Sequence, residues 1–84
     1  MLILEELRFV EGVEVAVAIK TYPDGKLTGK IRSAKPIADQ IAGYFGGGGH
    51  PYAAGFRIYE DYAETLPELV GATMKLLDQL PQDN

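Results

Sequence analysis

The chain has 84 residues, of which 46% are hydrophobic, so it is long enough for one small domain with a core of its own. Its 8 basic and 12 acidic residues give a net charge of −4, which argues against a generally basic nucleic-acid coat or an adhesive membrane surface. Cysteine is absent, which excludes disulfides, thiolate nucleophiles and cysteine-based zinc sites. With neither a long apolar run nor a recognisable signal peptide, we expect a soluble, cytoplasmic domain in which any bound anion is held by a local site.

The first part of the chain predicts three strands. Residues 2–10 are apolar-rich and end at a Glu-Gly pair, although a helix is the alternative because Glu, Leu and Arg favour helices. Residues 13–22 alternate apolar and polar side chains, as a half-buried strand does. The Pro-Asp-Gly turn at residues 23–25 leads into a return strand over residues 26–33. One face of that strand is cationic, with Lys26, Thr28, Lys30 and Arg32.

The remaining chain predicts a helix, a strand and a second helix. Apolar residues recur at helical spacing over residues 35–45, and the glycines that follow end this helix. Residues 51–60 resume an extended pattern. Residues 65–80 carry the strongest helical periodicity, introduced by a capping box of Thr65 and Glu68 with Pro67 in the first turn. The order β-β-β-α-β-α predicts an α+β fold, a single mixed or antiparallel sheet of about four strands with two helices packed on it.

Four consecutive glycines, residues 46–49, precede His50, the one histidine of the chain. A helix C-cap accounts for one or two of them, and each further glycine costs about 0.5–1 kcal/mol relative to alanine in an ordered segment. Consecutive glycine amides can instead form a concave nest of N–H donors around a phosphate. Because this run follows a helix and precedes a strand, no helix N-terminus would face the anion, so cationic side chains must supply more of the charge. His50 is then a candidate phosphate donor.

Arg32 is the second candidate for anion binding. Its planar guanidinium can hold a phosphate through two parallel hydrogen bonds. It ends its strand beside Ser33, a second donor, where the chain turns into the helix that leads to the glycines. Lys26 and Lys30 are expected on an ordinary solvated strand face.

Small and aromatic residues near the glycine run have two interpretations each. The segment "AAGF", residues 53–56, gives either close helix packing or clearance for a ligand, with equal weight. Three aromatic side chains could stack on a base, although packing in the core or at its rim is the preferred interpretation: Tyr44, Tyr52 and Phe56.

The sequence gives no support for a catalytic site. Metal-dependent hydrolysis needs a cluster of Asp, Glu or His ligands, and the acidic residues here are scattered without ligand-like spacing. Nothing in the spacing supports a triad of Ser33, His50 and Asp39. These residues therefore predict a binding module for a phosphorylated ligand, with catalysis elsewhere.

The segment "GGGGHPYAAGF", residues 46–56, preceded by "KIRS", residues 30–33, at the end of a strand, resembles the DHHA1 domain. This domain is the C-terminal, substrate-binding part of DHH-family phosphoesterases, and the resemblance covers essentially all of residues 1–84. It favours the branch of oligoribonucleases (nanoRNases) and 3′-phosphoadenosine-5′-phosphate phosphatases. RecJ-type exonucleases and cyclic-dinucleotide phosphodiesterases are more distantly similar.

The resemblance implies roles for particular residues. The terminal phosphate or sugar-phosphate of a short oligonucleotide would be held by Gly47, Gly48, Gly49 and His50. Arg32, with Ser33 nearby, would grip a phosphate or base. In the family an N-terminal domain supplies an Asp-His-His motif and Mn²⁺ across a cleft. This sequence contains no such motif, so we expect no cofactor in the chain itself and no activity of the chain alone.

Two alternatives stay open. The chain could be the substrate domain of a cyclic-dinucleotide phosphodiesterase, a RecJ-like exonuclease or an exopolyphosphatase. It could also be a structural domain that forms homo-oligomers, because the apolar pattern of residues 2–10 could leave an exposed edge strand for pairing between chains.

Overall fold

The computed structural model describes the backbone of residues 3–9 and all of residues 15–80. In chain order the elements are β1 (Ile3–Phe9), β2 (Val15–Thr21), β3 (Leu27–Ser33), α1 (Ala38–Gly43), β4 (Gly48–His50), β5 (Ala53–Ile58) and α2 (Tyr62–Asp78). The predicted α+β class and the predicted succession of strands and helices are confirmed. The addition is β4, a short strand formed by the last two glycines of the run and His50.

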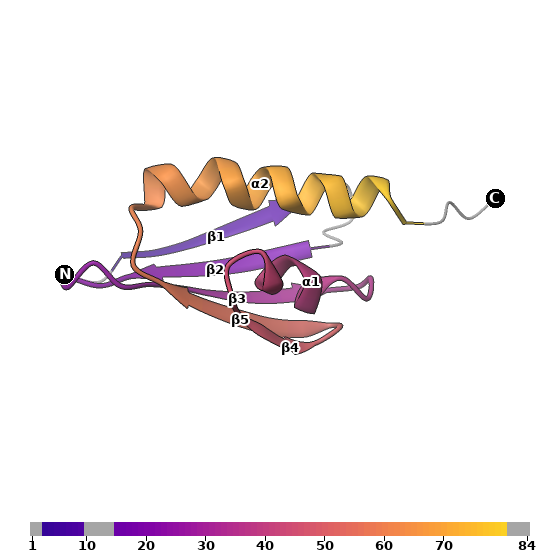
Figure 1. Ribbon diagram of the computed structural model, residues 1–84, viewed down its shortest axis with the longest axis horizontal. Coiled ribbons are helices and arrows are strands. Elements are labelled where there is room, and N and C mark those ends of the chain that lie inside the picture. The colour runs from indigo at the N-terminus through magenta and orange to yellow at the C-terminus, as the bar shows by residue number, and fades with distance from the viewer. Residues whose placement is uncertain (1–2, 10–14, 81–84) are drawn as a thin grey trace.

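The strands form one five-stranded sheet in the order β1-β2-β3-β5-β4. Every neighbouring pair is antiparallel, so the antiparallel alternative holds and the mixed one does not. Figure 1 shows the long helix α2 running along the sheet and the short helix α1 lying over β3 and β5. Strands β1 and β4 form the two edges of the sheet.

The hydrophobic core lies between the sheet and the two helices. It takes alternate residues of the strands, because successive side chains of a strand point to opposite faces. The largest contributions come from Val15, Val17, Ile19, Leu27, Ile31, Ile37, Ile41, Phe56 and Leu69. The intervening strand residues lie on the face that neither helix covers, which we call the open face: Ala16, Ala18, Lys20, Thr28, Lys30, Arg32, Gly48, His50, Ala53, Gly55 and Arg57.

Helix α2 begins earlier than predicted. Its N-cap is Asp61, whose carbonyl oxygen accepts the amide N–H groups of Glu64 and Thr65. Thr65 therefore lies inside the helix, fully buried, with its hydroxyl 2.9 Å from that carbonyl oxygen and 3.0 Å from Oε1 of Glu60. The predicted capping box of Thr65 and Glu68 does not form, and Pro67 lies beyond the first turn.

Candidate functional site

The glycine run divides between two elements. The amide of Gly46 donates to the carbonyl of Gly43 at 3.1 Å, and the amide of Gly47 donates to the carbonyl of Ala42 at 2.9 Å. These two bonds satisfy carbonyls at the end of α1, as amides beyond a helix C-terminus commonly do. The next two glycines belong to β4 and pair with β5. The four amides therefore do not converge into one phosphate nest.

At three of the four positions the fold itself requires glycine. Gly46 has φ +75° and Gly49 has φ +148°, a region that side chains rarely adopt. A Cβ atom at Gly47 would overlap the carbonyl oxygen of Gly55 and lie 2.7 Å from Cβ of Phe56.

Gly48 is different. A Cβ atom placed there would meet no atom within 4 Å, and its φ is not in the left-handed region. Gly48 pairs with Gly55, which pairs in turn with Lys30, so all three lie in one row across the open face. The missing side chain at Gly48 thus leaves open space on that face rather than room for another part of the fold.

A second row of the open face brings together the two strongest candidates from the sequence. Arg32 of β3 pairs with Ala53 of β5, and Ala53 pairs with His50 of β4. Residues paired in this way point to the same face of an antiparallel sheet. With neighbouring strands about 4.8 Å apart, the Cα atoms of Arg32 and His50 are about 10 Å apart, separated by one methyl group.

His50 is exposed and fixed in orientation by its neighbour. Its Nδ1 accepts the amide N–H of Tyr52 at 3.3 Å, and the two rings lie 5.9 Å apart. A neutral histidine that accepts at Nδ1 must carry its proton on Nε2. The turn between β4 and β5 therefore selects a tautomer whose remaining N–H is free to donate to a ligand.

The charges of strands β2 to β5 are separated from the acidic residues of residues 15–80. Strands β2 to β5 contain no acidic residue, and all four of their cations lie on the open face: Lys20, Lys30, Arg32 and Arg57. The carboxylates of residues 15–80 lie in the turn after β2, in the helices and in the segment before α2: Asp24, Asp39, Glu60, Asp61, Glu64, Glu68 and Asp78. The net charge of −4 therefore conceals a group of cations on β2 to β5, beside β1, which pairs Glu6 with Ala18 and Arg8 with Ala16.

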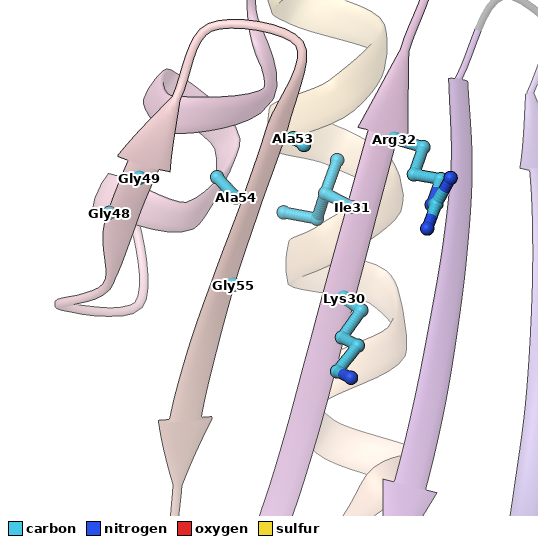
Figure 2. Close-up of a pocket in the computed structure, with 8 residues that line it drawn as sticks. All are labelled: Lys30, Ile31, Arg32, Gly48, Gly49, Ala53, Ala54 and Gly55. Carbon is cyan, nitrogen blue, oxygen red and sulfur yellow. The ribbon is translucent and has the colours of Figure 1, made fainter.

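A hollow of about 380 Å³ lies on the open face between β3, β5 and β4. Figure 2 shows the residues that line it: Lys30, Ile31, Arg32, Gly48, Gly49, Ala53, Ala54 and Gly55. We call it the β3–β5 hollow. Its floor is low because the side chain of Ala53 is a single methyl group and Gly55 has no side chain. Ala54 points to the opposite face and packs against the core. Alternation thus places Ala54 and Phe56 in close packing and leaves Ala53 and Gly55 on the open face, where clearance for a ligand stays a prediction.

Lys30 is the residue that sequence reasoning missed. It lines the hollow together with Arg32, and within the described residues no ion pair joins either cation to a carboxylate. The sequence does indicate this position, because Lys30 precedes Arg32 by two residues in a strand and side chains two residues apart point to the same face. Lys26, by contrast, precedes β3 and places its ammonium 4.1 Å from the ring centroid of Tyr22.

Ser33 is not brought to the open face. It pairs with the buried Val15, so it lies on the side of the helices. Its amide donates to the carbonyl of Tyr52 at 3.0 Å, and its Oγ accepts the amide N–H of Lys35 at 3.1 Å. These contacts shape the turn into α1. Asp39 accepts the amide of the next residue instead of contacting His50, so the three residues weighed as a triad are not joined.

The aromatic candidates divide in the same way. Phe56 is buried and stacks on Phe45, with 4.5 Å between ring centroids, so it is a core residue. Tyr44 and Tyr52 are 55% and 49% exposed. Of the two, Tyr52 lies beside the site through its contact with His50.

The described part of the chain offers neither a metal-ligand cluster nor a membrane-spanning helix. Residues 3–9 and 15–80 contain no group of three or more His, Asp or Glu side chains that could hold a metal ion. In the same residues no helix has the length and apolar character needed to cross a membrane.

Comparison with known protein families gives a match over nearly the whole chain. The family model of the DHHA1 domain matches residues 2–79, nearly the whole chain. Domains of this kind are accessory domains of DHH-family phosphoesterases, work with a DHH catalytic domain and bind nucleotide substrates. No curated protein matches the chain.

Proposed function

This chain belongs to the DHHA1 domain family, and we propose that it is the substrate-binding part of a DHH-family phosphoesterase that acts on short oligonucleotides or nucleotides. The observation that supports the proposal best is the row of Arg32, Ala53 and His50 on the open face, where strands β2 to β5 carry cations and no carboxylate. The two donors share this row, and because the side chain of Arg32 extends over β2, it must turn toward Ala53 to hold one phosphate together with His50.

Each donor has a distinct role in holding the phosphate. The guanidinium of Arg32 is always charged and presents two parallel N–H groups to a pair of phosphate oxygens. The Nε2–H of His50 donates from the other side of Ala53, in the tautomer that Tyr52 selects. Gly48 keeps the space beside His50 open, so the ligand can lie close to the backbone of β4. No carboxylate of strands β2 to β5 opposes the anion.

The chain supplies binding and orientation in this proposal, and bond cleavage belongs to a DHH domain. Mn²⁺, which the resemblance implies, would be held by that domain. The preferred substrates are those of the oligoribonuclease and phosphoadenosine-phosphate phosphatase branch. A cytoplasmic location stays a prediction.

Titration of the chain with 5′-phosphorylated di- to tetranucleotides tests the proposal. Arg32→Ala removes a charge-assisted hydrogen-bond donor and should weaken binding about 10- to 100-fold, while His50→Ala removes one donor and should weaken it about 5-fold. Arg57→Ala is the matched control. Arg57 lies on the same face, but it does not line the β3–β5 hollow and does not belong to the row of Arg32, Ala53 and His50. Equal affinities for the wild type, Arg32→Ala and His50→Ala would contradict the site.

Self-association is the second candidate, favoured by the position of β1 at an edge of the sheet. An edge strand presents unpaired backbone groups to another chain. Ile3→Lys places a charge on this strand and should shift a dimer to a monomer in sedimentation velocity. A wild-type chain that sediments as a monomer would rule this candidate out.

A further inference from the structure

Lys30 and Arg32 stand between two hollows. The second, of about 280 Å³, lies between β2 and β3 and is lined by Ala16, Ala18, Lys30 and Arg32. We call it the β2–β3 hollow. Figure 2 shows the side chain of Arg32 extending from β3 over the neighbouring strand, away from Ala53. The same two cations therefore line the β3–β5 hollow on one side and the β2–β3 hollow on the other.

The register explains why there are two hollows. Arg32 pairs with Ala16 on β2 and with Ala53 on β5, and Lys30 pairs with Ala18 and Gly55 in the same way. Each cation thus has a residue no larger than alanine on both sides.

Propensity alone does not account for the alanines of β2. Alanine is depleted in strands, and β-branched residues fit an exposed pleated surface better. The buried positions of the same strand are Val15, Val17 and Ile19, so β-branched residues occur throughout its other face. At the two open positions in between, Ala16 and Ala18 leave a depression instead of filling it.

From these contacts we propose that the β2–β3 hollow is a second subsite, which receives the next nucleotide unit of a ligand that crosses β3. The inference rests on the proposed phosphate-binding function of the β3–β5 hollow. Lys30 and Arg32 are two residues apart on one strand, so their Cα atoms are about 6.6 Å apart and they can hold different oxygens of the linking phosphate. A mononucleotide fills one hollow, whereas a dinucleotide fills both.

The two probes are adenosine 5′-monophosphate and the 5′-phosphorylated adenylate dinucleotide, each titrated into the 84-residue chain. The wild type should bind the dinucleotide on the order of 10-fold more tightly, as one additional charge-assisted hydrogen bond from Lys30 or Arg32 to the linking phosphate predicts. Ala18→Ile fills the β2–β3 hollow with a side chain that suits an exposed strand. It should remove the dinucleotide advantage and leave mononucleotide affinity unchanged. Ala16→Ile, the second variant, should do the same.

Two further variants separate the possible failures. Thr28→Ile places the same isoleucine side chain on the same face but outside both hollows, and it should preserve both affinities. Ala53→Ile fills the β3–β5 hollow and should weaken both probes. If Ala53→Ile has no effect, the proposed function itself is wrong. If Ala53→Ile weakens both probes but the dinucleotide advantage is absent, or survives in both Ala18→Ile and Ala16→Ile, the second subsite is wrong and the proposed function stands.

Discussion

Alanine substitutions across residues 46–49, made one at a time, should separate the glycines that the fold requires from the one that leaves space for a ligand. Gly47→Ala should be among the most damaging. Its new Cβ would overlap the carbonyl oxygen of Gly55, which is held in the sheet, and would lie 2.7 Å from Cβ of the buried Phe56. Overpacking of this kind lowers the free energy of unfolding by about 1–3 kcal/mol, and a collision with backbone belongs at the upper end.

The other three positions should follow a definite order. Gly49→Ala combines φ +148° with a Cβ 2.9 Å from the Cα of Ala54, so it should also lower the free energy of unfolding by about 2–3 kcal/mol. Gly46→Ala has free space but φ +75°, for which about 1–2 kcal/mol is expected. Gly48→Ala meets nothing within 4 Å and should be neutral, or stabilise by up to about 1 kcal/mol by restricting the unfolded chain.

Urea denaturation followed by far-ultraviolet circular dichroism measures these differences in the free energy of unfolding. In thermal unfolding, 1 kcal/mol corresponds to about 4–8 °C in Tm for a domain of this size. The same variants are then titrated with a 5′-phosphorylated dinucleotide. Gly48→Ala should retain full stability and bind more weakly, because its methyl group occupies the open space beside His50. A Gly48→Ala variant as unstable as Gly47→Ala, or a neutral Gly47→Ala, would refute this account of the glycine run.

Four substitutions away from the open face test the packing of the core and of α2. Thr73→Val should raise the free energy of unfolding by about 1–2 kcal/mol, because the buried Thr73 hydroxyl has no hydrogen-bond partner among the described residues. Thr65 is equally buried, but its hydroxyl is hydrogen-bonded, so Thr65→Val should lower the free energy of unfolding by about 1–3 kcal/mol. Gly71→Ala in α2 has open space around it and should stabilise by about 0.5–1 kcal/mol in thermal unfolding. Gly29→Ala should destabilise by about 1–3 kcal/mol, because its Cβ would overlap the ring of Phe56; a neutral result would mean that the ring can move aside.

The sequence predicts the local part of this fold well, because period-two alternation and the Pro-Asp-Gly turn locate β2 and β3 without information from elsewhere. It places the start of α2 wrongly, since the threonine-glutamate spacing resembles a capping box although Asp61 already begins the helix four residues earlier. It misses β4, because glycine has low strand propensity and this strand forms through its pairing with β5.

The site follows the same division between local and long-range information. Alternation predicts that Lys30 and Arg32 share a face. It does not predict the two hollows, because these depend on β3 lying between β2 and β5, a strand order set by pairing between distant segments. The row that joins Arg32 to His50 has the same origin, since β3 pairs with β5 across the intervening helix and glycine run. Sequence reasoning could therefore name both donors but could not bring them together.

The separation of charge between the open face and the helices gives a final prediction about how a chain of net charge −4 attracts an anion. Glu68→Gln on α2 and Arg32→Gln on the open face each change the net charge by one unit, in opposite directions. A helix packed on a sheet lies about 10 Å from it, whereas the Debye length is about 8 Å at physiological ionic strength. At that ionic strength Arg32→Gln should weaken binding of a 5′-phosphorylated dinucleotide about 10-fold, and Glu68→Gln should change it less than about 2-fold. In about 0.01 M salt, where the Debye length is about 30 Å, Glu68→Gln should strengthen binding measurably. If the two substitutions had equal and opposite effects at physiological salt, net charge and not the cationic open face would govern binding.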